Sequence, residues 1–386
     1  MTPRPDVIVS GGGPAGTLAA IRLAHGGARV VLCDRDVFPR HKLCGDTLNP
    51  GGVALLRASG LAGPIETHGL PLEGMLVTGA TGVSIRGTYG DGLVGRAWAR
   101  RHLDLQLLEA AGRAGVDVRT SVKVHAPLLA ADGRVAGVRL RLSNGHEETL
   151  ESRWTIAADG RRSPLGVGLG LIGHPRQPRR WAIGTYAEGV DRVEGFGEMH
   201  VRAGHYIGVA PAESGLVNLC LVTSARDGMD EPANRLWQAI RHDPILRERC
   251  ARARQVAPVV TLGPLAVDAR AVGVPGLLLA GDAAGFVDPM TGDGLHLALR
   301  GGQLAADVLL RHAGDVDDEV IARLRRTRRE AFGAKIRFNR ALRTLVGWPM
   351  GVRIGALGAA LLPAILRLVI ATAGDVADEH RRASAA

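Results

Sequence analysis

Short apolar runs separated by longer amphipathic stretches predict an α/β protein. Apolar runs at 7–10 and 28–33 flank a helix-like segment at 14–25, and a late run at 277–280 is again short and fully apolar. Runs of this length are typical of buried strands, whereas the segment at 14–25 is long enough for a helix. The start of the chain therefore predicts one strand–helix–strand unit.

The next part of the chain predicts a helix over 100–114 and a strand over 116–124, from the spacing of its apolar positions. Asp-Gly and Asn-Gly pairs then separate alternating runs at 135–142 and 147–154. Such pairs favour tight hairpin turns, so we expect a β-meander inserted after the first strand–helix–strand unit.

A second sheet is predicted from a later region. Residues 181–223 have the pattern of strands, and together with 70–98 they predict a second, antiparallel sheet. Gly204, Gly208 and Gly215 are the expected breaks between its strands. The two sheets are therefore expected to be interleaved along the sequence.

The composition narrows the classes of function that the protein could have. Of the 386 residues, 46% are apolar, 22% charged and only 3% aromatic, and 53 are glycines. This is the composition of a folded protein with many tight turns, and it argues against aromatic stacking on nucleic acid. The formal net charge of +10 comes from arginines that are scattered along the sequence without forming a stripe. We expect no nucleic-acid partner, although such a charge attracts a nicotinamide nucleotide, an anionic lipid or an acidic carrier domain.

The cysteines suggest a reducing compartment. Cys33, Cys44, Cys220 and Cys250 have neither a CxxC spacing nor a zinc-ligand pattern. We therefore expect no metal site and no disulfide framework. The N-terminal residues lack the basic and apolar regions of a signal peptide, which predicts a cytoplasmic protein.

A dinucleotide-binding motif follows the first predicted strand. Gly11-x-Gly13-x-x-Gly16 lies between that strand and the first helix, and Asp34 closes the second strand. Gly11 permits the turn, Gly13 lets the backbone approach a pyrophosphate, and Gly16 allows close packing of helix on strand. The helix N-terminus then faces the phosphates, and Asp34 can accept hydrogen bonds from ribose hydroxyls.

Two further motifs identify a family. Asp159-Gly160 follows the predicted meander and Gly281-Asp282 follows the late strand. With the glycine motif, they resemble the FAD-dependent oxidoreductases of the para-hydroxybenzoate hydroxylase fold, which include aromatic hydroxylases, flavin halogenases and geranylgeranyl reductases. The resemblance covers about residues 5–312. It implies a Rossmann-type FAD-binding domain with an inserted β-meander, interleaved with an antiparallel-sheet substrate domain, and a helical C-terminus.

The resemblance implies a role for each motif. Asp282 would bond a ribityl hydroxyl of FAD, and the loop Pro289–Gly294 would direct backbone N–H groups towards the flavin N1–C2=O edge. Asp293 either contributes to that site or caps the following helix. Arg100 matches the arginine that reaches FAD, with Arg101 as the alternative.

The segment that contains Asp159-Gly160 supports nicotinamide access in the family. The arginine usually found further along is replaced here by Pro164-Leu-Gly166. NAD(P)H is the expected reductant, and a protein reductant is the alternative.

One loop resembles the geranylgeranyl reductase branch in particular. Phe38-Pro-Arg-His-Lys42-Leu-Cys44-Gly45-Asp46 contains that branch's lysine-x-cysteine-glycine segment, which would bring Cys44 near the flavin and Lys42 or Arg40 near phosphate or substrate. Its basic residues could lower the pKa of the Cys44 thiol, which would make it reactive. The alternative is a buried structural cysteine.

The predicted site therefore has two parts. The predicted catalytic residues are Cys44, Lys42, Pro289 and Gly292. The predicted cofactor contacts are Gly11, Gly13, Pro14, Ala15, Gly16, Asp34, Arg35, Cys44, Gly45, Arg100, Val124, Asp159, Gly160, Gly281, Asp282, Gly292, Asp293 and Gly294.

The predicted activity is that of an NAD(P)H-dependent flavin monooxygenase, which would act on a lipophilic or aromatic small molecule through a C4a-hydroperoxyflavin. The alternative is a geranylgeranyl-reductase-like reductase of a carbon–carbon double bond. The halogenase signature Trp-x-Trp-x-Ile-Pro has no counterpart, and a non-catalytic flavoprotein is less favoured. The substrate could be free or tethered to a carrier protein, and the sequence leaves the oligomeric state open.

The C-terminal part is expected to be helical, over 295–311 and then 317–378. The uncharged run Ile354–Leu366 is shorter than the roughly 20 residues of a membrane-spanning helix. We expect it to cover a lipophilic substrate tunnel, with a peripheral membrane contact or an oligomer contact as alternatives.

The expected domains are discontinuous. They are an FAD-binding domain (1–69, 99–175 and 264–315), a substrate domain (70–98 and 176–263) and a C-terminal helical region (316–386).

Overall fold

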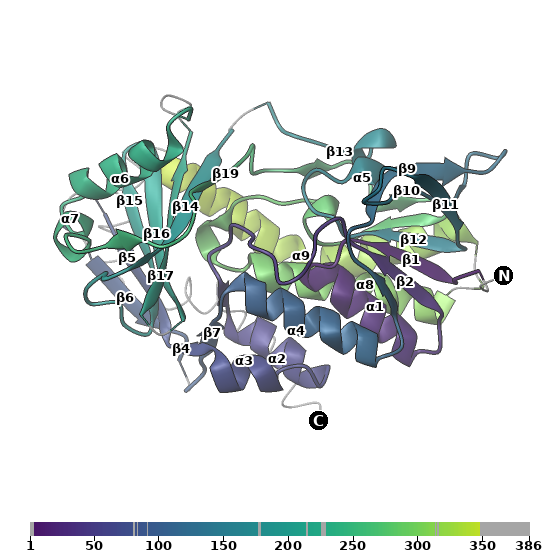
Figure 1. Cartoon of the computed structure of the whole chain (residues 1–386), viewed down its shortest axis with the longest axis horizontal. Coiled ribbons are helices and arrows are strands. Elements are labelled where there is room, and N and C mark those ends of the chain that lie inside the picture. Colours follow the sequence, from purple (N-terminus) through teal and green to yellow (C-terminus); the bar gives the residue numbers. More distant parts are fainter. Residues whose placement is uncertain are drawn as a thin grey trace.

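The computed structural model describes residues 4–347, apart from 80, 81, 83, 91, 177–178, 214, 225–228, 313 and 315. Two lobes lie side by side in it (Figure 1). One is built on a sheet that is parallel except for its edge strand β21, which we call the parallel sheet, and the other on a larger mixed sheet.

The parallel sheet begins with the predicted strand–helix–strand unit. β1 pairs in parallel with β2 on one side and with β12 on the other, so that Val9 lies beside Leu32 and Ile156. The late strand β22 extends the sheet beyond β12. The strand order is β21 (Gly273–Val274), β22 (Leu277–Leu279), β12 (Trp154–Ala157), β1 (Val7–Ser10), β2 (Val30–Cys33) and β8 (Asp117–Arg119).

Alternate side chains of β1 enter two different cores. Val7 and Val9 pack in a cluster with residues of α1, α4 and α8, whereas Ile8 packs in a cluster with the meander. The sheet is therefore buried on both faces, as its continuous apolar strands predict. The helices are α1 (Pro14–His25), α4 (Arg100–Arg113) and α8 (Gly294–His312), and the meander strands are β9 (Lys123–Leu129), β10 (Val135–Arg141) and β11 (Glu147–Glu151).

The structure corrects two predicted strands of this region. The single strand expected over 116–124 is two strands, because Ser121 has a φ of 58° and the chain leaves the parallel sheet after β8 to enter the meander as β9. Trp154, expected at the end of the meander, instead begins β12 of the parallel sheet.

The large sheet is mixed and not purely antiparallel as predicted, because β5 pairs in parallel with β15. Gly204 and Gly215 do lie in turns, with φ of 78° and 74°, but Gly208 lies inside β16 and pairs with Cys220. The strand order is β18 (Arg254–Gln255), β14 (Trp181–Glu188), β17 (Leu216–Thr223), β16 (His205–Glu213), β15 (Phe196–Arg202), β5 (Gly74–Thr78) and β6 (Ser84–Thr88), with β19 (Val260–Leu262) also paired to β14.

Short elements complete the two lobes. The ends of the segment 70–98 do not join the large sheet as expected, since β4 and β7 pair with each other, and β7 also pairs with β3. These elements are β3 (Thr47–Leu48), α2 (Pro50–Ala58), α3 (Gly63–His68), β4 (Leu70–Leu72), β7 (Gly95–Ala97), α5 (Pro164–Gly168), β13 (Ile172–Gly173), α6 (Pro232–His242), α7 (Leu246–Arg249) and β20 (Asp268–Ala269).

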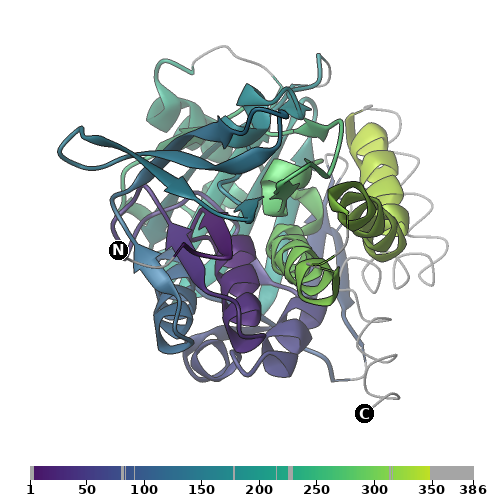
Figure 2. The same cartoon turned by 90° about the vertical axis from the view of Figure 1, so that its right-hand side faces the viewer.

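The last described helix, α9 (Asp317–Gly347), packs against α8 at the outside of the molecule (Figure 2). The remainder of the predicted helical region, including Ile354–Leu366, lies outside the described residues. Within the described part of the chain, no helix is both long and apolar enough to cross a membrane.

Candidate functional site

The glycine motif forms a tight loop between β1 and α1. Gly11 has a φ of 106°, and a Cβ there would lie 2.6 Å from the Ala158 carbonyl oxygen. A Cβ on Gly16 would lie 1.9 Å from the Gly11 oxygen, so this glycine is required for the close approach of helix and strand. At Gly13, by contrast, the nearest neighbour is the Arg40 Nη2 at 3.6 Å. Gly13 therefore has free space on the side of Arg40, and we call this space, between the glycine loop and Arg40, the groove.

The N-terminus of α1, which begins with Pro14 and Ala15, faces the same groove. Its N-cap is Gly13, and no side chain caps the first turn. N–H groups at such an end attract an anion, and the helix dipole adds to the attraction.

Asp34 lies at the end of β2, beside this loop. Its carboxylate accepts hydrogen bonds from the Gly12 N–H at 2.6 Å and from the Asp36 N–H at 2.9 Å. These bonds fix the carboxylate next to the groove. Arg35 is turned towards solvent, with 70% of its side chain exposed, and its contact is with Asp36.

Arg40 is the cation of the groove. Its guanidinium lies 3.0 Å from Asp36, 3.3 Å from Asp104 and 3.8 Å from Asp34, and only 12% of the side chain is exposed. Three carboxylates thus hold one buried cation beside the glycine loop.

Arg100 is held by Asp104 one turn further along α4. Two hydrogen bonds of 2.8 Å join its Nε and Nη2 to the two carboxylate oxygens. Both residues are buried, so the pair is rigid. Arg101, the alternative contact, instead bonds Glu213 at 3.1 Å and is half-buried.

The loop with the lysine-x-cysteine-glycine segment lies between Arg100 and the large sheet. Burial raises the pKa of the Cys44 thiol, in spite of the nearby Arg100 guanidinium. The expected lowering of this pKa by basic neighbours is therefore wrong, because loss of hydration outweighs their charge. Burial, together with the charges of Arg100 and Arg40, lowers the pKa of Lys42. Gly45, the next residue after Cys44, is exposed.

Asp46 ends this loop and is the centre of a polar cluster that sequence reasoning missed. Its φ is 56°, and its buried carboxylate accepts hydrogen bonds from the Tyr186 hydroxyl at 2.6 Å, the Asn218 amide at 2.7 Å and the Arg100 N–H at 3.1 Å. Burial nevertheless raises the pKa of Asp46 to about 6. The Asn218 amide also donates to the Cys44 carbonyl oxygen at 2.7 Å, which ties the loop to β17.

The Asp159-Gly160 and Gly281-Asp282 motifs both lie beside the glycine loop, since a Cβ on Gly11 would lie 2.7 Å from the Asp159 Cα and a Cβ on Gly281 2.9 Å from the Ala15 Cβ. Asp159 accepts a hydrogen bond from the Ser10 hydroxyl at 2.9 Å, and burial raises its pKa to about 6. Asp282 lies after β22, in the short 3-10 helix η1 (Gly281–Ala284), and its carboxylate is 3.8 Å from the Arg161 guanidinium. Gly160 and Gly281 have φ of 85° and 58°.

The loop expected to face the flavin edge contains a second 3-10 turn, η2 (Pro289–Thr291), and Gly292 in the left-handed region. Asp293 comes next and is 1% exposed. Its carboxylate accepts hydrogen bonds from the Thr291 hydroxyl at 2.8 Å and the Asn339 amide at 2.9 Å, and it lies 3.4 Å from the Lys335 ammonium. The side chain of Asp293 thus ties the loop to α9, immediately before α8 begins at Gly294.

An apolar core cluster, which we call the apolar wall, lies between this loop (Pro289–Gly294, the flavin loop) and the large sheet. It includes side chains from the cysteine loop, the flavin loop and strands of the sheet, among them Leu43, Tyr206, Cys220, Leu265 and Met290. The Tyr206 hydroxyl donates to Asp288 at 2.8 Å, and Arg180 lies 3.0 Å from the same carboxylate.

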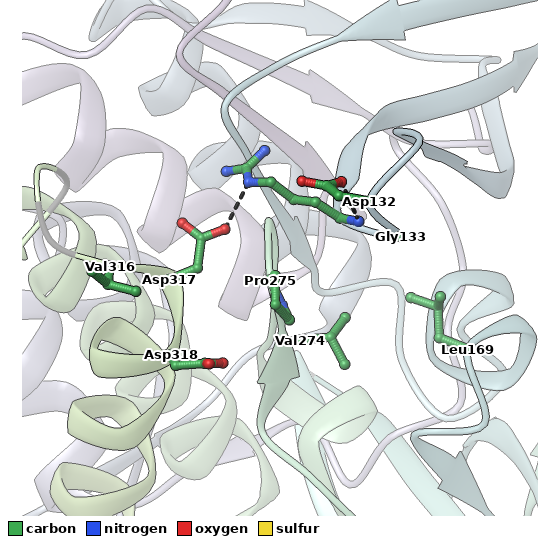
Figure 3. Close-up of a pocket in the computed structure, with 9 residues that line it drawn as sticks. Asp132, Gly133, Leu169, Val274, Pro275, Val316, Asp317 and Asp318 are labelled. Carbon is green, nitrogen blue, oxygen red and sulfur yellow. Dashed lines mark hydrogen bonds and ion pairs between the residues drawn. The ribbon is translucent and has the colours of Figure 1, made fainter.

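Val124 and a separate cavity lie away from these motifs. The Val124 side chain is buried in the core between the parallel sheet and the meander. A cavity of about 620 Å³ is lined by residues of the meander turn, β21 and the start of α9, where Arg134 lies 2.7 Å from Asp317 (Figure 3). It includes no residue of the three motifs.

The groove fits FAD. Its uncapped helix N-terminus and Arg40 suit a pyrophosphate, Gly13 leaves room for it, and Asp34 and Asp282 offer acceptors for hydroxyl groups. The FAD-binding domain family matches residues 4–339. The chain belongs to this family. It is an FAD-dependent oxidoreductase of the superfamily that includes geranylgeranyl reductases and flavin halogenases, which confirms the resemblance seen in the sequence.

Its relatives in this family include reductases and halogenases. A menaquinone reductase from Mycolicibacterium smegmatis is 31% identical over 341 residues, which cover 82% of this chain and 79% of that protein. A digeranylgeranylglycerophospholipid reductase 2 from Methanopyrus kandleri is 30% identical over 377 residues, covering 94% and 92%. The structure of the myxobacterial chondrochloren halogenase CndH, 25% identical, superposes with a TM-score of 0.80 and covers 95% and 91%.

Proposed function

We propose that the protein is an FAD-dependent reductase that saturates a carbon–carbon double bond of an isoprenoid lipid. The observation that carries this proposal is the loop 40–46, which connects the cofactor groove at Arg40 to a buried acid at Asp46 and borders an apolar wall through Leu43. Two relatives about 30% identical over most of their length are named menaquinone reductase and digeranylgeranylglycerophospholipid reductase 2, which supports the same assignment.

Saturation of a double bond requires a hydride and a proton. When bound, reduced FAD supplies the hydride. The proton can be held at the Asp46 carboxyl, since its pKa of about 6 leaves part of the population protonated near neutral pH. The Tyr186 hydroxyl, 2.6 Å from that carboxyl, is the group that would relay the proton towards the apolar wall.

The wall and the surrounding residues would position the substrate. Apolar side chains favour a lipid chain and exclude water, which limits the loss of reducing equivalents to solvent. NAD(P)H is the proposed source of these equivalents, with Asp159 and Gly160 beside its access route. The monooxygenase predicted from the sequence stays the second candidate, because it would use the same cofactor groove and the same apolar wall.

The test is the product formed from a geranylgeranyl lipid or a menaquinone with chemically reduced enzyme, under air and under nitrogen. A reductase adds two hydrogen atoms in both atmospheres, whereas a monooxygenase adds one oxygen atom and only under air. Tyr186→Phe should reduce turnover while FAD content is retained, with Tyr89→Phe, at a buried tyrosine outside the site, as a matched control. Oxygen incorporation by the wild-type enzyme would contradict the proposal.

A further inference from the structure

We propose that the outer face of α9 docks on an anionic lipid membrane. The buried face of this helix is apolar and packs on the molecule through Val320, Ile321, Leu324 and Phe332. The opposite face is strongly basic. Between 322 and 340, its exposed charged side chains are Arg323, Arg325, Arg326, Glu330, Arg329, Arg337 and Arg340.

Four of these arginines form a stripe, which we call the arginine stripe: Arg326, Arg329, Arg337 and Arg340. At about 100° per residue, their spacing places all four within one sector of about 80° of the helix. Among the described residues, none of the four has a carboxylate partner. The arginines that look scattered along the sequence are thus gathered on one side of a helix by its period.

Exposed arginines on the other lobe differ in this respect. Arg86, Arg192, Arg252 and Arg254 are 54–78% exposed, and each lies within 3.2 Å of a carboxylate of its own lobe. Their charge is largely compensated within the molecule. The arginine stripe instead offers its charge to an external anion.

A lipid surface fits the stripe better than a nucleic acid or an acidic protein. The chain continues from α9 into the uncharged run Ile354–Leu366, whose sequence is too apolar for a nucleic-acid contact. A basic helix face followed by an apolar segment is typical of proteins that bind anionic bilayers peripherally. With 3% aromatic residues, the chain also offers few stacking groups for bases.

Docking on this face would place the membrane on the outer side of α9, and the inner side of the same helix contacts the flavin loop and the residues just before it. Arg328 donates to the Ala284 carbonyl at 3.1 Å, Asn339 to Asp293 at 2.9 Å and Arg343 to the Val287 carbonyl at 3.4 Å, all from α9. The stripe is therefore fixed rigidly to the site. The choice of a membrane as partner rests on the proposed isoprenoid lipid substrate, which would reside in it.

Vesicle flotation of the full-length holoenzyme tests the proposal. Vesicles of phosphatidylcholine alone are compared with vesicles that also contain phosphatidylglycerol, at low and high salt. We expect binding to the anionic vesicles only, weakened by salt. Replacing the four stripe arginines by glutamine should lower the bound fraction about tenfold or more, because each arginine near such a surface contributes separately.

A matched variant controls for net charge. Replacing Arg86, Arg192, Arg252 and Arg254 by glutamine removes the same charge from the other lobe and should leave binding unchanged, while FAD content reports folding of both variants. Equal binding by the stripe variant and wild type, binding to neutral vesicles alone, or binding to double-stranded DNA in place of vesicles would each overturn the proposal. Flotation requires no substrate, so it remains decisive even if the reductase assay fails.

Discussion

Lys335→Met tests whether α9 holds the flavin loop in place. The ammonium of Lys335 lies 3.4 Å from the Asp293 carboxylate, and the two side chains are 6% and 2% exposed. Methionine keeps the length and the apolar stem of the lysine but removes its charge. Asp293 would then be left buried, with hydrogen bonds from Thr291 and Asn339 as compensation.

The loss of stability can be bounded from this geometry. Removing one partner of a buried ion pair costs about 3–5 kcal/mol when the other charge has no compensation. Two hydrogen bonds to the carboxylate remain, each worth about 1.5 kcal/mol or more, so we expect a loss of up to about 2 kcal/mol in the free energy of unfolding.

Denaturant unfolding, followed by flavin fluorescence and by circular dichroism, measures this loss. The control is Lys123→Met, since Lys123 is an exposed lysine of β9. The double variant with Asp293→Asn should recover part of the stability, because no charge is then left buried. If Lys335→Met were as stable as the Lys123 control, or if the double variant were less stable than Lys335→Met alone, the ion pair would not hold the loop.

Four other outcomes are expected. Asp282→Ala should weaken FAD binding by about 1.5–3 kcal/mol, measured by equilibrium dialysis, and an unchanged affinity would refute its bond to the cofactor. Gly13→Val should abolish FAD retention in the purified protein, because the side chain would fill the groove; a yellow variant would contradict this. Cys44→Ser should keep folding and FAD content but change turnover or flavin potential. A variant equal to wild type in both would show that Cys44 has only a packing role. Asp46 and Asp159 have pKa values raised from 3.8 to about 6. Each therefore binds its proton more tightly in the folded state, so the free energy of unfolding should decrease as pH rises from about 4 to about 6, by up to about 3 kcal/mol per carboxyl. Asp46→Asn should flatten this profile in thermal unfolding scans, and an unchanged profile would show that Asp46 does not cause it.

Local signals allowed most of the cofactor groove to be predicted. The glycine loop, Asp34 and the helix that follows are contiguous in the chain, so their residue types and spacing suffice to specify them. Arg100 and Asp104 could be placed together for a similar reason, because they are one turn apart on a single helix.

The polar cluster around Asp46 could not be predicted in the same way. Its partners Tyr186 and Asn218 come from two strands of the large sheet, and they look like ordinary strand residues in the sequence. The parallel pairing of β5 with β15 was missed for a related reason, since alternation of apolar residues carries no information on strand direction. The bend at Ser121 was missed because nothing in the residue type requires a positive φ there.

The tie between Asp293 and α9 means that the cofactor site is completed late in synthesis of the chain. The glycine loop leaves the ribosome first, but β22 is made near the end of the described chain and Lys335 later still. Until then β12 is an open sheet edge and the flavin loop lacks its tie to α9. We therefore expect FAD to be retained only after the chain has been synthesised through α9, and a shorter nascent chain to be recognised by chaperones and proteases as unfinished.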